Sequence, residues 1–436
     1  MQDSVALQRY LQRHIESGLP PCPPGPSRWH HVLVIPAYRE PATLLQCLAQ
    51  IPAGTGRTLV ILVLNRPDTD PETQANAPLR EALRGRFKAS APGSESRIGR
   101  LNDHCDLYVH DLESSAGPVP AAQGVGLARK IGCDTALRWM HEGAISGDWI
   151  CSTDADAALP PDYFARLGRC NTTTAAVFPF QHIPGPDLAC NQATALYELR
   201  LHHYVLGLEY AASPYAHHSL GSCLAVRPEA YAQVRGFPRR AGGEDFYLLN
   251  KLSKLGPVAR LGGQGIQLQS RYSRRVPFGT GPAVDKIAGA AQPAQLPLFY
   301  HPACFAALRA VLAAVPVYWQ AANTDLQDLL LERTMEPELA RACSTALDRM
   351  GMQDALAHCR RQGKSSEQFL RQFHQWFDAF RSLKFIHALR DTGWPQQSLA
   401  GLGALQPGLW PGDNTDGMSV GELLSAVNRH WGWQYW

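Results

Sequence analysis

The chain has 436 residues, of which 45% are hydrophobic, and a formal net charge of +3. Its length corresponds to about two or three globular domains. Charged residues, at 18% of the chain, are fewer than the roughly 25% of typical soluble domains, so the composition does not favour nucleic-acid binding through bulk charge. The most apolar stretch, residues 310–319, is about half of the ~20 residues that a membrane span needs, and we expect no transmembrane segment.

The cysteine residues predict a reducing compartment. There are eleven of them, an odd number without any C-x-x-C pair, and the N-terminal sequence MQDSVALQRYLQRHIESG does not have the pattern of a signal peptide. We therefore expect free thiols and a cytoplasmic protein.

Composition divides the chain into three predicted parts. Residues 1–28 combine a candidate amphipathic helix with the stiff, proline-rich connector LPPCPPGPS. Residues 29–300 alternate apolar runs with helical patterns, and residues 301–436 are rich in Leu, Ala, Arg and Gln at helical spacing. We expect an α/β domain followed by a mainly helical C-terminal region. The Trp-rich tail of that region either packs onto the body of the protein or offers a stacking surface to an acceptor.

Strands and helices alternate in the first part of the α/β domain. Residues 31–36 and 58–65 are unbroken apolar runs, the pattern of strands that are covered on both faces. Further strands are predicted at 106–110 and 148–153, and helices at 40–51 and 124–143. Residues 66–102 are rich in Pro, Gly, Arg and Ser without a sustained period, which predicts a long loop or an insertion. This alternation is typical of a mostly parallel sheet.

Polar residues follow each predicted strand. They are Pro36 to Glu40, Asn65 to Asp68, Asp111, and Asp154 with Asp156. In open parallel sheets ligands bind beyond the carboxyl ends of the strands, so these positions are candidates for one binding site. The alternative is that they are ordinary turn residues, because Asp, Asn and Pro are favoured in turns whatever the function.

The segment CSTDADAALPPDYF, residues 151–164, carries two carboxylates at the end of the fourth predicted strand. Side chains alternate between faces along a strand, so Asp154 and Asp156 are expected to point to the same side and to address one cation. Mg²⁺ and Mn²⁺ favour oxygen ligands, and Mg²⁺ is commonly held by one or two carboxylates together with substrate phosphates. The alternative is a turn or helix-capping role for either residue.

A second acidic pair is formed by Glu244 and Asp245. The segment GGEDFYLLNKLSKLG, residues 242–256, predicts a helix that begins near Glu244. Asp245 shares a helical stripe with four residues, Leu248, Leu249, Leu252 and Leu255, so we expect it to face the apolar side. The helix dipole would keep such an acid ionised and able to accept a proton. The alternative is a carboxylate that only satisfies the helix N-terminus.

Four segments, in order, resemble the signature blocks of family-2 glycosyltransferases with the GT-A fold. They are VLVIPAYRE, GDWICSTDADAALPPDYF, LGSCLAVRPEAYAQVRGFP and GGEDFYLLNKLSKLG, and the resemblance covers about residues 30–280. It implies a Rossmann-like domain that moves a sugar from a nucleotide-diphospho-sugar, a UDP- or GDP-sugar, to the hydroxyl of an unknown acceptor, with inversion. A retaining transferase on the same fold and a non-catalytic nucleotide-binding or interaction protein stay open as alternatives.

The resemblance also implies roles for individual residues. Asp154 and Asp156 would bind Mn²⁺ or Mg²⁺ and the diphosphate, while Asp245, with Glu244 beside it, would act as the catalytic base. The residues implied or offered as nucleotide contacts are Pro36, Ala37, Tyr38, Glu40, Asn65 and Asp68.

The chain departs from the family pattern at three places. After the second strand it has LNRPDTD, so Asn65 or Asp68 is predicted in place of the usual base-contacting Asp. Arg235 stands where Gly is common. No later His is available as a metal ligand, so Gln269 or water is expected to complete the coordination.

Basic residues near the end of the resemblance are candidates for holding the diphosphate. Arg271, Arg274 and Arg275 lie in the segment QLQSRYSRRVPFGTG, and Arg meets phosphate oxygens with a fork of donors. Arg129 and Lys130 are lesser candidates for the same role. The alternative is a solvated basic loop.

Overall fold

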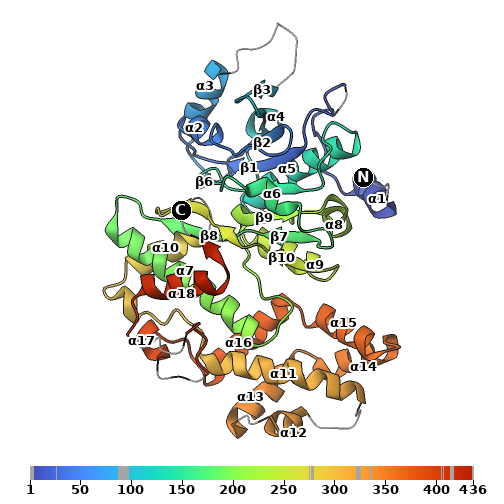
Figure 1. Cartoon of the computed structure of the whole chain (residues 1–436), viewed down its shortest axis with the longest axis vertical. Coiled ribbons are helices and arrows are strands. Elements are labelled where there is room, and N and C mark those ends of the chain that lie inside the picture. Colours follow the sequence, from blue (N-terminus) through green and yellow to red (C-terminus); the bar gives the residue numbers. More distant parts are fainter. Residues whose placement is uncertain are drawn as a thin grey trace. The chain divides into compact units, whose positions relative to one another are not determined.

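The computed structural model describes residues 4–25, 27–86, 98–273, 275, 279–320, 326–333, 336–403, 405, 407–412 and 417–434 (Figure 1). The chain forms two compact units. The first consists of Met1–Asn191, Ser219–Asp285 and Gly432–Trp436, and the second of Gln192–His218 and Lys286–Trp431. The predicted division at residues 28 and 300 stays a prediction.

The first unit is built on an eight-stranded sheet in the order β10-β7-β9-β5-β1-β2-β4-β3. Its strands are β1 (His31–Ala37), β2 (Thr58–Leu64), β3 (Ile98–Arg100), β4 (Cys105–Asp111), β5 (Ile150–Ser152), β7 (Ala175–Val177), β9 (Leu224–Val226) and β10 (Val258–Arg260). The central strands β5, β1, β2 and β4 pair in parallel, whereas β9 runs antiparallel to both β5 and β7. The predicted fold class, a mostly parallel α/β sheet with a helical C-terminal region, is confirmed.

The central strands form where the sequence predicts them. The predicted runs at 31–36, 58–65 and 106–110 correspond to β1, β2 and β4, and every residue of β2 is buried. Buried aliphatic side chains on both faces are the reason these strands read as continuous apolar runs. In the register, Val34 of β1 pairs with Ile61 of β2 and with Ser152 of β5, so these strands end at the same edge of the sheet.

The helices of this unit are α1 (Val5–Arg13), α2 (Leu44–Leu48), α3 (Ala77–Arg86), α4 (Leu112–Ala116), α5 (Gly124–His141), α6 (Tyr163–Leu167), α8 (Pro228–Gln233) and α9 (Glu244–Leu252). The long helix α5 contacts β1 and β2 (Figure 1). A Cβ atom added to Gly132 of α5 would lie 2.3 Å from Cγ1 of Val34, so glycine is required for this close approach.

One expected loop is partly regular structure. Residues 66–102, predicted as a long loop or an insertion, contain α3 and β3, and residues 87–97 lie outside the described part. Leu79 and Leu83 of α3 are buried, and Arg80 forms ion pairs with Asp111 and Glu113. The helix therefore depends on tertiary contacts that its short apolar pattern did not reveal.

Two small sheets are also found among the described residues of the first unit. One is formed by β6 (Ala157–Ala158), β12 (Ile266–Gln269) and β8 (Phe180–Ile183), and the other by β11 (Gly263–Gln264) and β13 (Trp433–Gln434). Trp433 is buried, and its ring lies 5.7 Å from that of Phe180. This tryptophan of the tail thus has a packing role; Trp436 lies outside the described residues.

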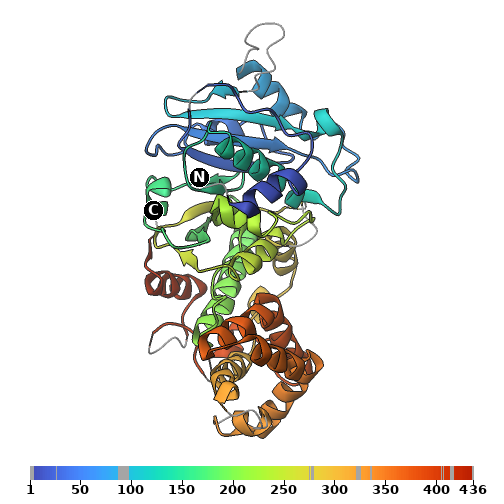
Figure 2. The same cartoon turned by 90° about the vertical axis from the view of Figure 1, so that its right-hand side faces the viewer.

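The second unit is helical, as predicted for the C-terminal region, and most of it is coloured orange to red in Figures 1 and 2. Its helices include α11 (Pro302–Gln320), α12 (Leu326–Leu331), α13 (Pro337–Arg349), α14 (Met352–Gln362), α15 (Ser366–Trp376), α16 (Ala379–Thr392), α17 (Leu399–Leu402) and α18 (Val420–His430). Helix α7 (Leu188–Tyr210) enters this unit at Gln192, and α10 (Thr280–Ala288) at Lys286.

Among the described residues, only α11 is long and apolar enough to cross a membrane by length and composition. Of its most apolar window, 56% is buried within the protein. Phe305, Leu308 and Val311 of this helix belong to the core of the second unit. A core helix of a globular protein meets the same criterion, so this finding is weak evidence for a membrane span.

Candidate active site

The carboxylates of the D-x-D segment lie in a turn, because β5 ends at Ser152 and the chain bends before β6. The amide of Ala157 donates to the carbonyl of Asp154 at 3.3 Å. The expectation that strand alternation orients Asp154 and Asp156 is therefore wrong, since neither residue is in a strand. The side chains of Asp154 and Asp156 are 43% and 27% exposed, so both remain accessible to a ligand.

Arg129 of α5 connects the two acidic pairs. Its guanidinium donates to Oδ1 of Asp154 at 2.5 Å and to Oε1 of Glu244 at 2.9 Å, and also to Oγ of Ser152 at 2.6 Å. A Cβ atom added to Gly221 would lie 2.6 Å from this guanidinium, so the arginine occupies space that only a glycine leaves free. The D-x-D segment and the Glu244–Asp245 pair thus belong to one site.

The buried guanidinium is charged. Burial by itself lowers the pKa of Arg129, but the charges of Asp154 and Glu244 outweigh that effect and raise it above its ordinary value. From the sequence, Arg129 is only a lesser candidate for diphosphate binding. The available signal was a basic residue in the middle of a helix whose neighbouring residues are buried. Its acidic partners are distant in sequence, so this signal does not identify them.

Glu244 and Asp245 occupy the first turn of α9. The predicted stripe is confirmed for the fully buried Leu248, Leu249 and Leu252. It is wrong for Leu255, which is 46% exposed because α9 ends at Leu252. The more buried acid is Glu244, at 4% exposure, while Asp245 is half-buried. Asp245 accepts a hydrogen bond from the amide of Phe246 at 2.6 Å. The expectation that the helix dipole keeps Asp245 ionised is wrong below neutral pH, because burial, followed by the charge of Glu244, raises its pKa to about 7. This value is suited to proton transfer near neutral pH.

The residues after β1 form a second part of the site. Pro36 and Ala37 are the last residues of β1, and Oη of Tyr38 donates to Oδ2 of Asp70 at 2.6 Å. Glu40 forms an ion pair with Arg275, which also donates to the carbonyl of Tyr38 at 3.1 Å. The predicted nucleotide segment and the basic segment at 271–275 therefore meet.

Asn65 and Asp68 make contacts with the backbone. Nδ2 of the buried Asn65 donates to the carbonyl of Ala37 at 3.3 Å, and Oδ1 of Asp68 accepts from the amide of Ala121 at 2.9 Å. The carboxylate close to the predicted nucleotide segment is instead Asp70, which was not among the residues predicted from the sequence. Its hydrogen bonds to Arg39, despite the opposing effect of burial, lower the pKa of Asp70 well below its ordinary value.

Arg271 pairs with the second carboxylate of the D-x-D segment. Its Nε lies 2.6 Å from Oδ2 of Asp156, and its side chain is 37% exposed. Gln269, proposed as a further metal ligand, is the last residue of β12 and is half-buried. Arg274 lies outside the described residues.

Asp154 and Asp156 are the candidate ligands for a cation that is shared with a substrate, and each of them is paired with an arginine. Within the described ranges no group of three or more His, Cys, Asp and Glu side chains could hold a metal ion. Asp154 and Asp156 supply two partly exposed carboxylates, which matches the one or two carboxylates that Mg²⁺ uses when phosphates complete its coordination.

Arg235 has a backbone conformation that explains why glycine is common at its position in the resembling family. Its φ is +66°, in the left-handed region, which glycine adopts without the steric cost of a Cβ atom. Gly236 follows it with the same φ.

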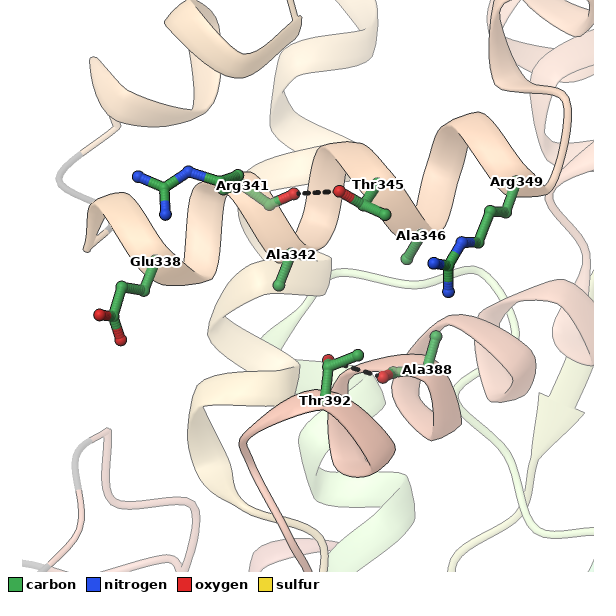
Figure 3. A pocket seen from close by; sticks show the side chains of 8 residues that line it. All are labelled: Glu338, Arg341, Ala342, Thr345, Ala346, Arg349, Ala388 and Thr392. Atoms are coloured by element: carbon green, nitrogen blue, oxygen red, sulfur yellow. Dashed lines mark hydrogen bonds between the residues drawn. The ribbon is translucent and has the colours of Figure 1, made fainter.

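A cavity of about 250 Å³ belongs to the helical unit and lies between α13 and α16 (Figure 3). Small side chains, Ala342, Ala346 and Ala388, line it together with Arg341 and Arg349. None of the predicted site residues takes part in its lining.

No protein-family model and no curated protein matches this chain. Among solved structures, it is similar to S. aureus TarS residues 1–349 in complex with UDP, at 12% identity and a TM-score of 0.35, covering 81% of this chain and 91% of that one. A second structure of S. aureus TarS has 14% identity and a TM-score of 0.34, with coverage of 79% and 55%. The mannosyltransferase PcManGT from Pyrobaculum calidifontis, in complex with GDP-Man and Mn²⁺, has 15% identity and a TM-score of 0.35, with coverage of 85% and 92%. Likenesses of this size identify neither donor nor metal for this chain.

Proposed function

We propose that this protein is a metal-dependent glycosyltransferase of the GT-A type. It moves a sugar from a nucleotide-diphospho-sugar to an acceptor hydroxyl, with inversion at the anomeric carbon. The observation that carries the proposal is the contact of one buried guanidinium, that of Arg129, with both Asp154 and Glu244. This contact supports the proposal because it joins one member of each acidic pair; the first pair would hold a diphosphate and the second would accept a proton.

Asp245 is proposed as the catalytic base. An acceptor hydroxyl must lose its proton as its oxygen attacks the anomeric carbon, and a half-buried carboxylate with a pKa of about 7 can accept that proton at neutral pH. Glu244 holds Arg129 at 2.9 Å and contributes its charge to the raised pKa of Asp245. We therefore assign Glu244 to positioning rather than to proton transfer.

Asp154 and Asp156 are proposed to hold Mn²⁺ or Mg²⁺ together with the donor diphosphate. When bound, the cation would offset negative charge on the leaving nucleoside diphosphate. Arg271, Arg274 and Arg275 are proposed to donate to the phosphate oxygens. Arg271 now pairs with Asp156, so it would exchange this carboxylate for a phosphate as the donor binds.

The nucleoside is proposed to bind beside the segment from Pro36 to Glu40. Tyr38 offers a ring for stacking, and Asp70 holds its hydroxyl at 2.6 Å. Asn65 and Asp68, predicted as base contacts, stay proposals for that role. A UDP- or GDP-sugar is the proposed donor, and the acceptor is unknown.

A cytoplasmic location is also proposed. All eleven cysteines are free thiols, which is typical of proteins in a reducing compartment.

The test is the thermal stability of the protein with UDP, GDP, CDP and ADP, each with and without Mn²⁺. A ligand at about 100 times its Kd adds about 2.7 kcal/mol to the free energy of unfolding. We expect a metal-dependent rise in Tm with one nucleotide, followed by turnover of the corresponding sugar nucleotide. No rise with any nucleotide would contradict the proposal. The anomeric configuration of the product, measured by NMR, then separates inversion from retention.

A further inference from the structure

A buried polar network, which the proposed reaction does not use, joins α1 to α5 and α8. At its centre is Asp134 of α5, which is fully buried. Its Oδ1 accepts from Tyr10 at 2.6 Å and from Tyr231 at 3.0 Å, and its Oδ2 accepts from Lys130 at 3.1 Å and from the amide of Glu16 at 2.9 Å. Four donors thus fix one carboxylate and hold the N-terminal segment, residues 4–16, against α5.

The same N-terminal segment reaches a loop next to the candidate site. The carboxylate of Glu16 accepts two hydrogen bonds from Arg239, from Nε at 2.8 Å and from Nη2 at 2.9 Å. The side chain of Glu16 is 10% exposed, and its Oε1 lies 4.0 Å from Nζ of Lys130. The side chain of Arg239 is 52% exposed, so water screens its charge. Its two hydrogen bonds to one carboxylate nevertheless define the direction as well as the distance of the contact.

The loop after Arg239 packs backbone against backbone on the start of α5. The amide of Gly126 donates to the carbonyl of Arg240 at 2.9 Å. A Cβ atom on Gly126 would lie 2.4 Å from the carbonyl oxygen of Pro238, and one on Gly124 would lie 2.8 Å from Cα of Ala241. Residues 238–241 therefore lie directly against the backbone of α5, without intervening side chains. A small shift of this loop would move the start of α5, and a shift of α5 would move the loop.

This loop leads directly into the acidic pair. Glu244 begins α9 only a few residues after Arg239, and it meets Arg129 on α5. The neighbouring residue on α5, Lys130, binds the network around Asp134. The N-terminal network thus holds α5 through Lys130, and α5 holds the acidic pair through the adjacent Arg129.

We propose that Glu16 and Arg239 are positioning residues for the proposed glycosyl transfer: they hold the loop 238–243, and through it they set the location of Asp245. The inference rests on the proposed function, because it assigns these residues to the same reaction. It gives the N-terminal segment a role in turnover that goes beyond packing.

The test compares Arg239→Gln with Arg57→Gln. Arg57 also forms a bidentate pair with a carboxylate of the same unit, that of Asp106, at 3.2 and 2.5 Å. Arg57 precedes β2, whereas Asn65, which belongs to the predicted site, follows β2, so this pair lies at the other end of the strand. Turnover, donor KM and Tm are measured for both variants, together with hydrogen exchange of residues 238–250. We expect Arg239→Gln to lower kcat by about tenfold with little change in donor KM, since small displacements of a catalytic group cost rate. Both variants should lower Tm to a similar extent, but Arg57→Gln should leave kcat unchanged.

The exchange measurement separates this inference from the proposed function. Faster exchange over 238–250 in Arg239→Gln than in Arg57→Gln is expected, and partial recovery of kcat in Arg239→Lys would support the positioning role. Equal kcat and equal exchange in the two glutamine variants would overturn it. If the wild-type protein itself has no turnover, the proposed function fails, and the exchange result alone decides whether Glu16 and Arg239 hold the loop.

Discussion

The two carboxylates of the D-x-D segment make the same kind of contact in different surroundings. Asp154 pairs with Arg129 and Asp156 with Arg271, each with a shortest contact of 2.5 Å. The side chain of Arg129 is 4% exposed and that of Arg271 is 37% exposed. Equal distances therefore hide an inner contact, whose arginine is part of the core, and an outer contact, whose arginine a ligand can displace.

The two arginines differ because of the elements that carry them. Arg129 projects from α5, which is anchored on β1 and β2, and it has a second carboxylate partner in Glu244. Arg271 follows β12 in an irregular segment and pairs with Asp156. A buried charge cannot lose its partners without a large cost, whereas an exposed pair is screened by water.

The largest expected effect is that of breaking the inner contact with Arg129→Gln. The substitution leaves the carboxylate of Glu244 buried without a cation, and losing one partner of a buried pair costs about 3–5 kcal/mol. Chemical denaturation of the variant should show this loss in the free energy of unfolding. The double variant with Glu244→Gln should recover much of it, and a double variant as unstable as the single one would contradict the argument.

The next effect concerns the base. Asp245→Asn should reduce turnover by roughly 10² or more, because the general base is lost, while nucleotide affinity stays nearly unchanged. Steady-state kinetics and nucleotide titration measure the two quantities separately. Turnover within a few-fold of wild type would exclude Asp245 as the base.

Asp245 should also make activity and stability depend on pH in opposite directions. Turnover should rise as pH increases through about 7, because the base must be deprotonated. The folded state keeps a proton on Asp245 between its ordinary pKa of 3.8 and about 7, whereas the unfolded state has lost it. Its contribution to stability is therefore present below pH 4 and is lost as pH rises to 7. Melting curves of wild type and Asp245→Asn from pH 4 to 8 would show this difference, and parallel pH profiles would speak against a raised pKa.

At the outer contact, Asp156→Ala should remove the metal dependence of nucleotide binding. The nucleotide that raises the Tm of the wild type in a metal-dependent way should stabilise this variant equally with and without Mn²⁺. The reason is that the variant has lost one of the two carboxylate ligands of the cation. Thermal melts with and without Mn²⁺ measure this difference. A variant that still gains stability from Mn²⁺ would place the cation elsewhere.

The smallest effect is expected for Arg271→Gln. An exposed ion pair contributes about 0–1 kcal/mol, so the free energy of unfolding should change little. Mn²⁺ alone should bind more tightly to this variant, because Asp156 no longer has a competing cation. Calorimetric titration of Mn²⁺ into wild type and variant checks this, and unchanged affinity would mean that Arg271 does not compete with the metal.

The central strands could be predicted because each carries its own signal. Residues 31–36 and 58–65 are continuous apolar runs, and no distant partner is needed to read them. Helix α3 was missed because only Leu79 and Leu83 of its residues are buried, while Arg80 joins it to Asp111 and Glu113. Elements that depend on such tertiary contacts have weak local patterns.

In the candidate site, the two acidic pairs could be located from sequence, but Asp70 and the partners of the two pairs could not. Asp154, Asp156 and the Glu244–Asp245 pair stand in recognisable segments. Arg129 lies 25 residues from Asp154 and 115 from Glu244, and nothing local indicates these contacts. The orientation of the D-x-D pair failed for another reason: the strand ends at Ser152, so alternation does not reach the carboxylates.

The sequence separations of these contacts have a consequence for folding. Tyr10 meets Asp134 across 124 residues, Arg129 meets Glu244 across 115, and Glu16 meets Arg239 across 223. Contacts between residues that are far apart in the sequence form slowly, because closing the long loop between them costs conformational entropy first. During synthesis β1, β2 and β4 can pair while α9 is still absent, so the acidic pairs come together only late. A nascent chain therefore exposes an unfinished sheet edge for a long interval, and its yield should depend on chaperones more than on the stability of the finished fold.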